Sequence, residues 1–171
     1  MEPALVEYLR GRFGAPEAAR IACRWRQVFG VDAQADDLPR IPRHHEEYDD
    51  LLALLLEHAA DARESTAAVA RWVAFSCIGE SHLWEDLGLP DRPELTRLMG
   101  DCFPRLRERN GANMRWKKFF YKQLCDRAQV QACRAPRCDA CTEYRLCFGP
   151  EQPRSAHTGG IVNTAGARAS T

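Results

Sequence analysis

The sequence has no long hydrophobic run and no export signal. Its longest aliphatic run is Leu51–Leu56, which is far shorter than the roughly 20 residues that a membrane-spanning helix needs. The first residues, Met-Glu-Pro-Ala-Leu-Val-Glu, lack the basic stretch and the apolar core of a signal peptide. We therefore expect a soluble cytoplasmic protein that makes no membrane contact and keeps its cysteines reduced.

The sequence also lacks the signatures of common catalytic sites and of β-structure. It contains no glycine-rich phosphate loop and no Ser/His/Asp signature, so we do not expect an enzyme. Neither strand-like alternation nor an internal repeat is present. The chain has 171 residues and 45% hydrophobic content, enough for one domain with its own core. We expect an all-α helical bundle over residues 1–150 and a disordered tail over 151–171, where small and polar residues dominate.

Apolar residues at helical spacing, with glycine and proline as stop signals, predict the positions of the helices. The expected ranges are 3–13, 16–29, 48–60, a helix capped by Ser65 or Thr66, a short helix within 81–90, then 93–102, 104–109 and 112–127. The proline-containing segment 32–43 is a predicted loop. Cys23, Cys77 and Cys102 fall inside these helices, and we interpret them as small buried residues.

Cysteine, by contrast, is abundant, and four of the eight cysteines lie within 15 residues near the end of the chain. Cys133, Cys138, Cys141 and Cys147 have the spacing C-x4-C-x2-C-x5-C. A loop this short can fold its sulfurs around one point, and thiolates favour zinc, copper(I) or iron–sulfur centres. Because converging reduced thiols without a metal are open to oxidation, the loop predicts a metal centre.

The spacing does not decide between zinc and an iron–sulfur cluster. Zinc ribbons usually pair two C-x-x-C knuckles, whereas here only Cys138 and Cys141 form one. The gaps of four and five residues are loose for a single ion and suit the wider corners of a cluster. The pattern favours a cluster slightly and leaves zinc open.

The cysteine loop lies in a basic part of the chain. Residues 104–145 carry 11 basic and four acidic side chains, whereas residues 1–103 carry 11 basic and 19 acidic ones. Within the expected helix 112–127, an aromatic face formed by Trp116, Phe119 and Phe120 lies roughly opposite a basic face formed by Arg115, Lys118 and Lys122. This local field favours an anion or an acidic partner surface near the loop.

Several segments together resemble one known family. They are WKKFFYKQLC at 116–125, the four-cysteine loop, CFGPE at 147–151 and HLWEDLGL at 82–89, with further likeness at Phe103, Pro104, Asn110 and Met114. In these features the chain resembles the nitrogen-fixation protein family NifQ. The likeness is concentrated in residues 81–151. The tail of 20 residues beyond Glu151 departs from the pattern that we expect of the family.

The resemblance implies a molybdenum carrier for the iron–molybdenum cofactor of nitrogenase. It implies an iron–sulfur cluster of the 4Fe-4S or Mo-3Fe-4S type with Cys133, Cys138, Cys141 and Cys147 as ligands. Molybdate would be the metal source, and the cofactor scaffold complex acting with the nitrogenase iron protein would receive the molybdenum. If molybdenum occupies one cubane corner, its own ligand stays open among the remaining loop cysteine, His82, Cys125 and solvent.

Two other functions are compatible with the same loop. The first is a zinc-stabilised module that binds protein or nucleic acid, using Trp116, Lys117, Lys118 and Lys122 on nucleic acid; the acidic first part of the chain argues against nucleic acid. The second is an electron-transfer protein or redox enzyme that uses the cluster, although no second catalytic constellation accompanies it.

Overall fold

The computed structural model describes residues 1–30, 45–131, 133 and 137–151, and these residues form helices, turns and bends without a β-strand. The helices are α1 (Pro3–Phe13), α2 (Ala15–Phe29), α3 (His45–Glu57), α4 (Glu64–Ser76), α5 (Leu83–Asp86), α6 (Arg92–Cys102), α7 (Pro104–Arg109), α8 (Trp116–Arg127), the 3₁₀ turn η1 (Cys138–Ala140) and α9 (Tyr144–Phe148). The all-α prediction is confirmed. The loop predicted at 32–43 and the tail 152–171 lie outside the described residues.

Helix α4 is the centre of the fold. Its side chains from Thr66 to Ser76 are buried almost without exception, as expected of a helix that is surrounded by others. Helices α1 and α3 pack directly against it. Leu51, Leu54 and Leu55 of α3 are buried in this contact, which follows their i, i+3, i+4 spacing.

A close backbone contact joins the segment after α5 to α2. Gly88 has a φ of 72°, and a Cβ at this position would lie 2.7 Å from the carbonyl oxygen of Ile21. Only glycine combines this left-handed conformation with so short an approach. The contact holds the segment after α5 close to α2.

Helix α8 begins later than the predicted residue 112. Asn110, which is buried, donates its side-chain N–H to the carbonyl oxygen of Met114 and accepts the Met114 N–H, at 2.9 and 2.8 Å. This bridge, together with the positive φ of 58° at Asn113, holds 110–114 in a turn. The predicted aromatic face is confirmed, because Trp116, Phe119 and Phe120 are all buried.

Two local predictions are wrong. Cys23 is exposed rather than buried, because it lies two residues from both Ile21 and Trp25 and so projects from the opposite side of α2. Neither Ser65 nor Thr66 caps α4, whose N-cap is Arg63. Asp61 orders this end instead, since its carboxylate accepts the Arg63 N–H and the Thr66 hydroxyl at 3.0 and 2.7 Å.

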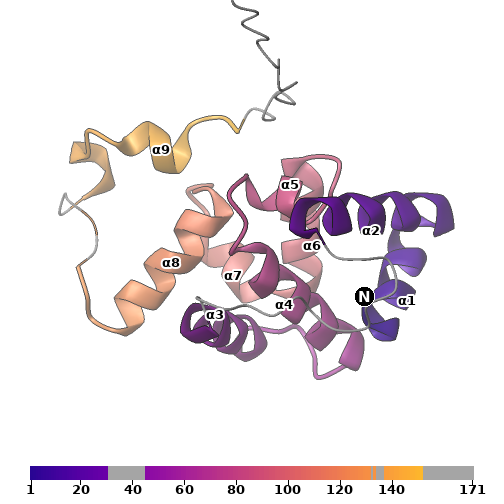
Figure 1. The fold of residues 1–171 in the computed structure, drawn as a ribbon. Helices are drawn as coiled ribbons and strands as arrows, with labels where there is room; N and C mark the ends of the chain where they lie inside the picture. Colours follow the sequence, from indigo (N-terminus) through magenta and orange to yellow (C-terminus); the bar gives the residue numbers. More distant parts are fainter. Residues whose placement is uncertain (31–44, 132, 134–136, 152–171) are drawn as a thin grey trace, which may run out of the picture.

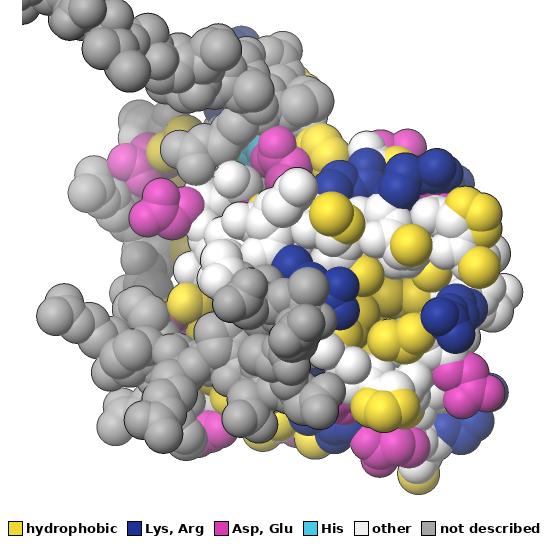
Figure 2. Space-filling view, turned by 45° about the vertical axis from the view of Figure 1, so that its right-hand side comes forward, with side chains coloured by type: hydrophobic (Ala, Val, Ile, Leu, Met, Phe, Trp, Pro, Cys, Tyr) yellow, Lys and Arg dark blue, Asp and Glu magenta, His cyan; other side chains and the backbone are white. Residues whose placement is uncertain are grey.

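The surface over α1 and α2 exposes apolar side chains. Figure 2 shows hydrophobic side chains gathered in the middle of this face, with Lys and Arg side chains at its border. Partly buried residues such as Met1 and Tyr8 belong to the edge of the core here. None of the described helices is both long and apolar enough to cross a membrane.

Candidate metal centre

The cysteine loop leaves the far end of α8 and returns to its beginning. Figure 1 shows the chain moving away from α8 and coming back through η1 and α9. The N–H of Cys141 donates to the carbonyl oxygen of Cys138 at 3.2 Å, and the N–H of Tyr144 donates to that of Cys141 at the same distance. Because residues three apart eclipse each other in a 3₁₀ turn, Cys138 and Cys141 start on the same side of η1.

The four predicted ligands differ in exposure. Cys133 and Cys138 are exposed, whereas Cys141 and Cys147 are partly buried. Cys147 packs with Phe148 at the edge of the hydrophobic core, so it is the loop thiol most firmly attached to the helical domain. None of the eight cysteines forms a disulfide within the described part of the chain, which leaves every loop thiol free to bind a metal.

The end of the loop is fastened to the start of α8. The N–H of Arg115 donates to the carbonyl oxygen of Cys147 at 2.7 Å. The Arg115 guanidinium donates to the carbonyl oxygens of Gly149 and Pro150 at 3.3 and 3.1 Å. These three bonds orient α9 and present its cysteine beside the first turn of α8.

A second arginine holds the following residue. Arg92 Nη1 lies 2.8 Å from Glu151 Oε1, and the Glu151 side chain is only 4% exposed. Arg92 Nη2 also donates to the carbonyl oxygens of Asn113 and Met114, at 2.9 and 3.0 Å. Glu151, which we had assigned to the disordered tail, is therefore part of the folded structure.

The four loop thiols share one electrostatic neighbourhood. The pKa of the Cys147 thiol is raised first by partial burial and also by the nearby Cys133, Cys138 and Cys141, whereas the Lys118 ammonium acts in the opposite direction. The pKa of Lys122 is raised mainly by its hydrogen bond to Asp126, with a further contribution from Cys133 and Cys138. The basic face of α8 thus borders the cysteine loop.

The thiols are near one another but do not surround a single point. Among the described residues, no group of three or more His, Cys, Asp or Glu side chains is arranged to hold one metal ion. A tetrahedral zinc ion with Zn–S bonds of about 2.3 Å requires sulfurs roughly 3.8 Å apart. A cluster binds each thiolate through a different iron, so it accommodates sulfurs that lie further apart than those around a single ion. Four free thiols beside two lysines fit that donor chemistry.

The structure places the two further ligand candidates at opposite ends of α8. His82 precedes α5 and lines a cavity of about 330 Å³, together with Lys118, Leu146 and Glu151. Cys125 lies near the other end of α8, partly buried, and its carbonyl oxygen accepts the Val130 N–H at 2.9 Å. His82 is therefore on the side of the loop that holds Cys147.

One functional feature was missed in the sequence. Lys117, which we had considered only as a nucleic-acid contact, forms an ion pair with the buried Asp86 and donates to the carbonyl oxygen of Gly79 at 2.6 Å. Asp86 also accepts the Ser81 N–H at 3.2 Å. Asp86 follows a second acid, Glu85, in the segment 82–89, so no local signal marks Asp86 as buried or identifies which cation supplies the charge.

Comparisons with known proteins identify the family. The NifQ family model matches residues 13–149. Protein NifQ of Azotobacter vinelandii is 45% identical over 106 residues, which cover 62% of this chain and 54% of that protein. Protein NifQ of Rhodobacter capsulatus is 38% identical over 143 residues, which cover 84% of this chain and 79% of that protein.

A third relative shows how much of the length of these proteins the chain covers. Protein NifQ of Klebsiella pneumoniae is 47% identical over 87 residues, which cover 50% of this chain and 52% of that protein. The chain thus spans about half the length of two of these three relatives. No solved structure matches the chain. The family match includes α2 to α9 and all four loop cysteines, and on this basis the chain belongs to the NifQ family.

Proposed function

We propose that this protein is a non-enzymatic molybdenum carrier for nitrogenase cofactor assembly. Membership of the NifQ family supports a role in nitrogen fixation. In this proposal Cys133, Cys138, Cys141 and Cys147 hold an iron–sulfur cluster, of the 4Fe-4S or Mo-3Fe-4S type, in the cytoplasm. Molybdate is the source of the metal, and the cofactor scaffold complex with the nitrogenase iron protein receives it.

The observation that carries the proposal is the presence of four free thiols in one short loop whose end is hydrogen-bonded to Arg115 at the start of α8. Gathering four thiolates costs electrostatic free energy, because like charges at close range repel one another. Lys118 beside Cys147, and Lys122 beside Cys133 and Cys138, offset part of that repulsion. When bound, the cluster supplies sulfide-rich coordination that retains molybdenum.

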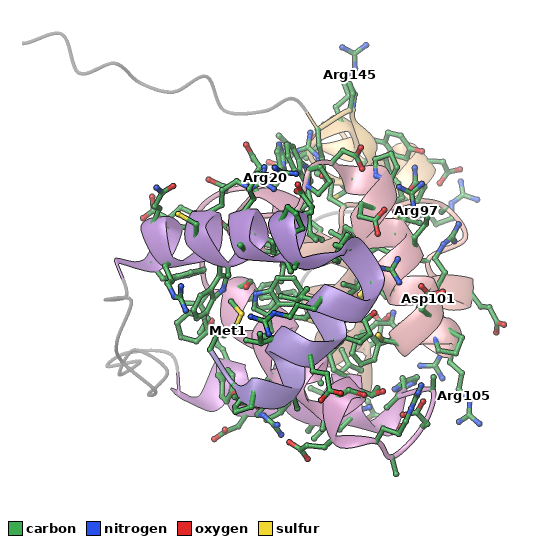
Figure 3. The ribbon with its side chains drawn as sticks, turned by 90° about the vertical axis from the view of Figure 1, so that its right-hand side faces the viewer. Met1, Arg20, Arg97, Asp101, Arg105 and Arg145 are labelled. Atoms are coloured by element: carbon green, nitrogen blue, oxygen red, sulfur yellow. The ribbon has the colours of Figure 1, made fainter. Side chains whose placement is uncertain are left out.

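The helical domain contributes a rigid support for the loop. Arg115 fixes Cys147 at one end of α8, while α8 itself continues directly to the chain that carries Cys133. The exposed thiols Cys133 and Cys138 lie on the outside of this arrangement. Figure 3 shows Arg145 of α9 projecting away from the helices.

The nucleic-acid form of the zinc hypothesis loses two of its four proposed contacts. Trp116 is only 2% exposed and is therefore not available to stack on a base. Lys117 is paired with Asp86. A zinc centre that serves only to stabilise the fold stays as the competing interpretation, and metal analysis separates it from the carrier.

The decisive experiment is analysis of iron, molybdenum and zinc in protein purified without oxygen, with EPR spectra of the same sample. We expect brown protein that contains iron and molybdenum. Replacing any one loop cysteine by alanine, for example Cys138→Ala, should lower the content of both metals severalfold. Cys23→Ala is the matched control, because Cys23 is an exposed thiol far from the loop in sequence. Colourless protein with one zinc per chain would contradict the proposal.

A further inference from the structure

The residues that line the cavity beside Cys147 have no assigned role in the proposed cluster site. Its volume is about 330 Å³, and it lies between the segment before α5, the first turn of α8 and the end of the cysteine loop. Leu83 and Leu146 provide apolar walls, and Ser81 and His82 add polar groups. Apolar walls lower the local dielectric constant, so a charged ligand would interact more strongly with the cavity than with open solvent.

The charges that line the cavity do not cancel. Lys117 is neutralised by Asp86, and Glu151 by Arg92. Arg115 directs its guanidinium to two backbone carbonyls, which orient the group without neutralising it. Lys118 forms no ion pair with any described residue. Glu80, an exposed side chain, is the acid left at the rim. The cavity therefore has an excess of positive charge.

The first turn of α8 adds a second source of positive potential. Its opening N–H groups have no intrahelical acceptor, and neither a side-chain cap nor an acidic first-turn residue is present. Cations at this end of a helix oppose the helix dipole, so Lys117 and Lys118 stand where carboxylates are normally favoured. An anion in the cavity would relieve this conflict, since it is attracted by the helix dipole and by the Lys118 ammonium group.

One buried carboxylate oxygen also lacks a partner. Glu151 Oε2 is buried and accepts no hydrogen bond, although Glu151 lines the cavity and its side chain is 4% exposed. An acceptor in this position calls for an O–H donor, from a ligand or from the water that accompanies it. The site thus offers positive charge together with one acceptor, which suits a hydrated or protonated oxyanion better than a bare halide.

We propose that this cavity binds a small tetrahedral oxyanion of the molybdate class immediately beside Cys147. The inference rests on the proposed function for the identity of the anion, and it adds where the anion enters. Lys118 is the principal contact, and Arg115 and the α8 N-terminus contribute to the potential. Because Leu146, the neighbour of Cys147 in the chain, lines the cavity, the site would hold the oxyanion next to the predicted cluster ligands.

The test is equilibrium dialysis of the full-length protein against molybdate at low ionic strength, with sulfate and phosphate in parallel arms. Lys118→Gln should weaken molybdate binding about tenfold or more, because a charge-assisted hydrogen bond is lost. Arg97→Gln is the control, since Arg97 is an exposed cation on α6 that does not line the cavity. It should change binding less than about twofold. Competition by sulfate would support the oxyanion class.

Two outcomes would overturn the site. The first is equal binding by the Lys118→Gln and Arg97→Gln proteins. The second is loss of molybdate binding in Cys147→Ser, which would mean that the thiols, not the cavity, hold the anion. Iron analysis of the same samples separates the two proposals. If the iron content is normal and Lys118→Gln does not change molybdate binding, only the cavity proposal is rejected. If the protein contains no iron but its molybdate binding depends on Lys118, only the cluster-carrier proposal is rejected.

Discussion

At the scale of single residues, the Asp86–Lys117 pair is a largely buried ion pair whose loss we expect to destabilise the fold. It connects α5 to α8 beneath the cavity. Gly79 is required beside it, because a Cβ at this position would lie 2.5 Å from Asp86 Cγ. Asp86 is 1% exposed and Lys117 is 17% exposed, so water screens the pair only weakly. Removal of one partner would leave an uncompensated charge in the protein interior.

The first prediction follows from the titration of Asp86. Burial raises the pKa of Asp86, and Lys117 opposes that shift. The stability contributed by a group with a raised folded-state pKa is fully present below its ordinary pKa, here about 3.9, and is lost as pH rises through the raised value. Lys117→Met removes the opposing charge, so its destabilisation should grow from pH 4 to pH 7. At pH 7 we expect a loss of about 3–5 kcal/mol.

Urea unfolding at several pH values measures this effect. Lys118→Met is the control, because the neighbouring lysine is exposed and should alter the unfolding free energy by less than about 0.5 kcal/mol. A destabilisation of Lys117→Met that is constant from pH 4 to pH 7 would contradict the role assigned to Asp86.

At the scale of elements, α8 connects the helical core to the cysteine loop. Its aromatic side is buried, and Lys118 and Lys122 on its other side border the thiols. Two arginines, Arg92 on α6 and Arg115 at the start of α8, fasten the returning segment 147–151 to this helix. The position of α9 therefore depends on contacts made at the beginning of α8.

The second prediction concerns Arg92, which bonds to Glu151 and to two carbonyls of the turn before α8. Arg92→Met should release segment 144–151, and amide hydrogen exchange there should become about tenfold faster, while α4 stays protected. Arg97→Met is the matched control, because Arg97 lies on the same helix with its side chain 63% exposed and paired only with Glu94. Equal exchange in both variants would show that Arg92 does not hold the loop.

At the scale of the whole molecule, the hydrophobic core and the candidate metal centre are separate. The buried core runs from Leu5 to Phe120, and the loop adds only partly buried contacts through Cys147 and Phe148. Small zinc modules differ, because they depend on the metal for folding itself. Here the helical domain has enough buried apolar surface to fold without the loop.

The third prediction is that metal removal leaves the helical domain folded. A variant with all four loop cysteines changed to serine should lose iron and molybdenum. It should keep its helical circular dichroism and unfold cooperatively, with Tm lowered by less than about 5 °C. Limited proteolysis should cut within residues 128–143 of the variant. Loss of cooperative unfolding on chelation would favour the structural zinc interpretation instead.

Local patterns were sufficient to predict most of the helices. The ranges 3–13 and 104–109 agree with α1 and α7, because proline at the first turn and a stop residue after the helix define them within the segment itself. The spacing of the loop cysteines is likewise a local property, and it indicated a metal centre without any tertiary contact. Burial of Trp116, Phe119 and Phe120 followed from their shared helical face.

Tertiary structure decided the features that depend on partners distant in sequence. Lys117 and Asp86 are 31 residues apart, and Arg92 and Glu151 are 59 apart, so no local pattern pairs them. Cys23 is exposed because Ile21 and Trp25 pack into the core, and Cys23 lies on the opposite, solvent-facing side of α2. The sequence alone therefore determined which residues are the candidate thiolate ligands and how they are spaced. Its position beside a basic helix and a charged cavity was set by the way α5, α6 and α8 pack together, because electrostatic potential depends on distance in space, not along the chain.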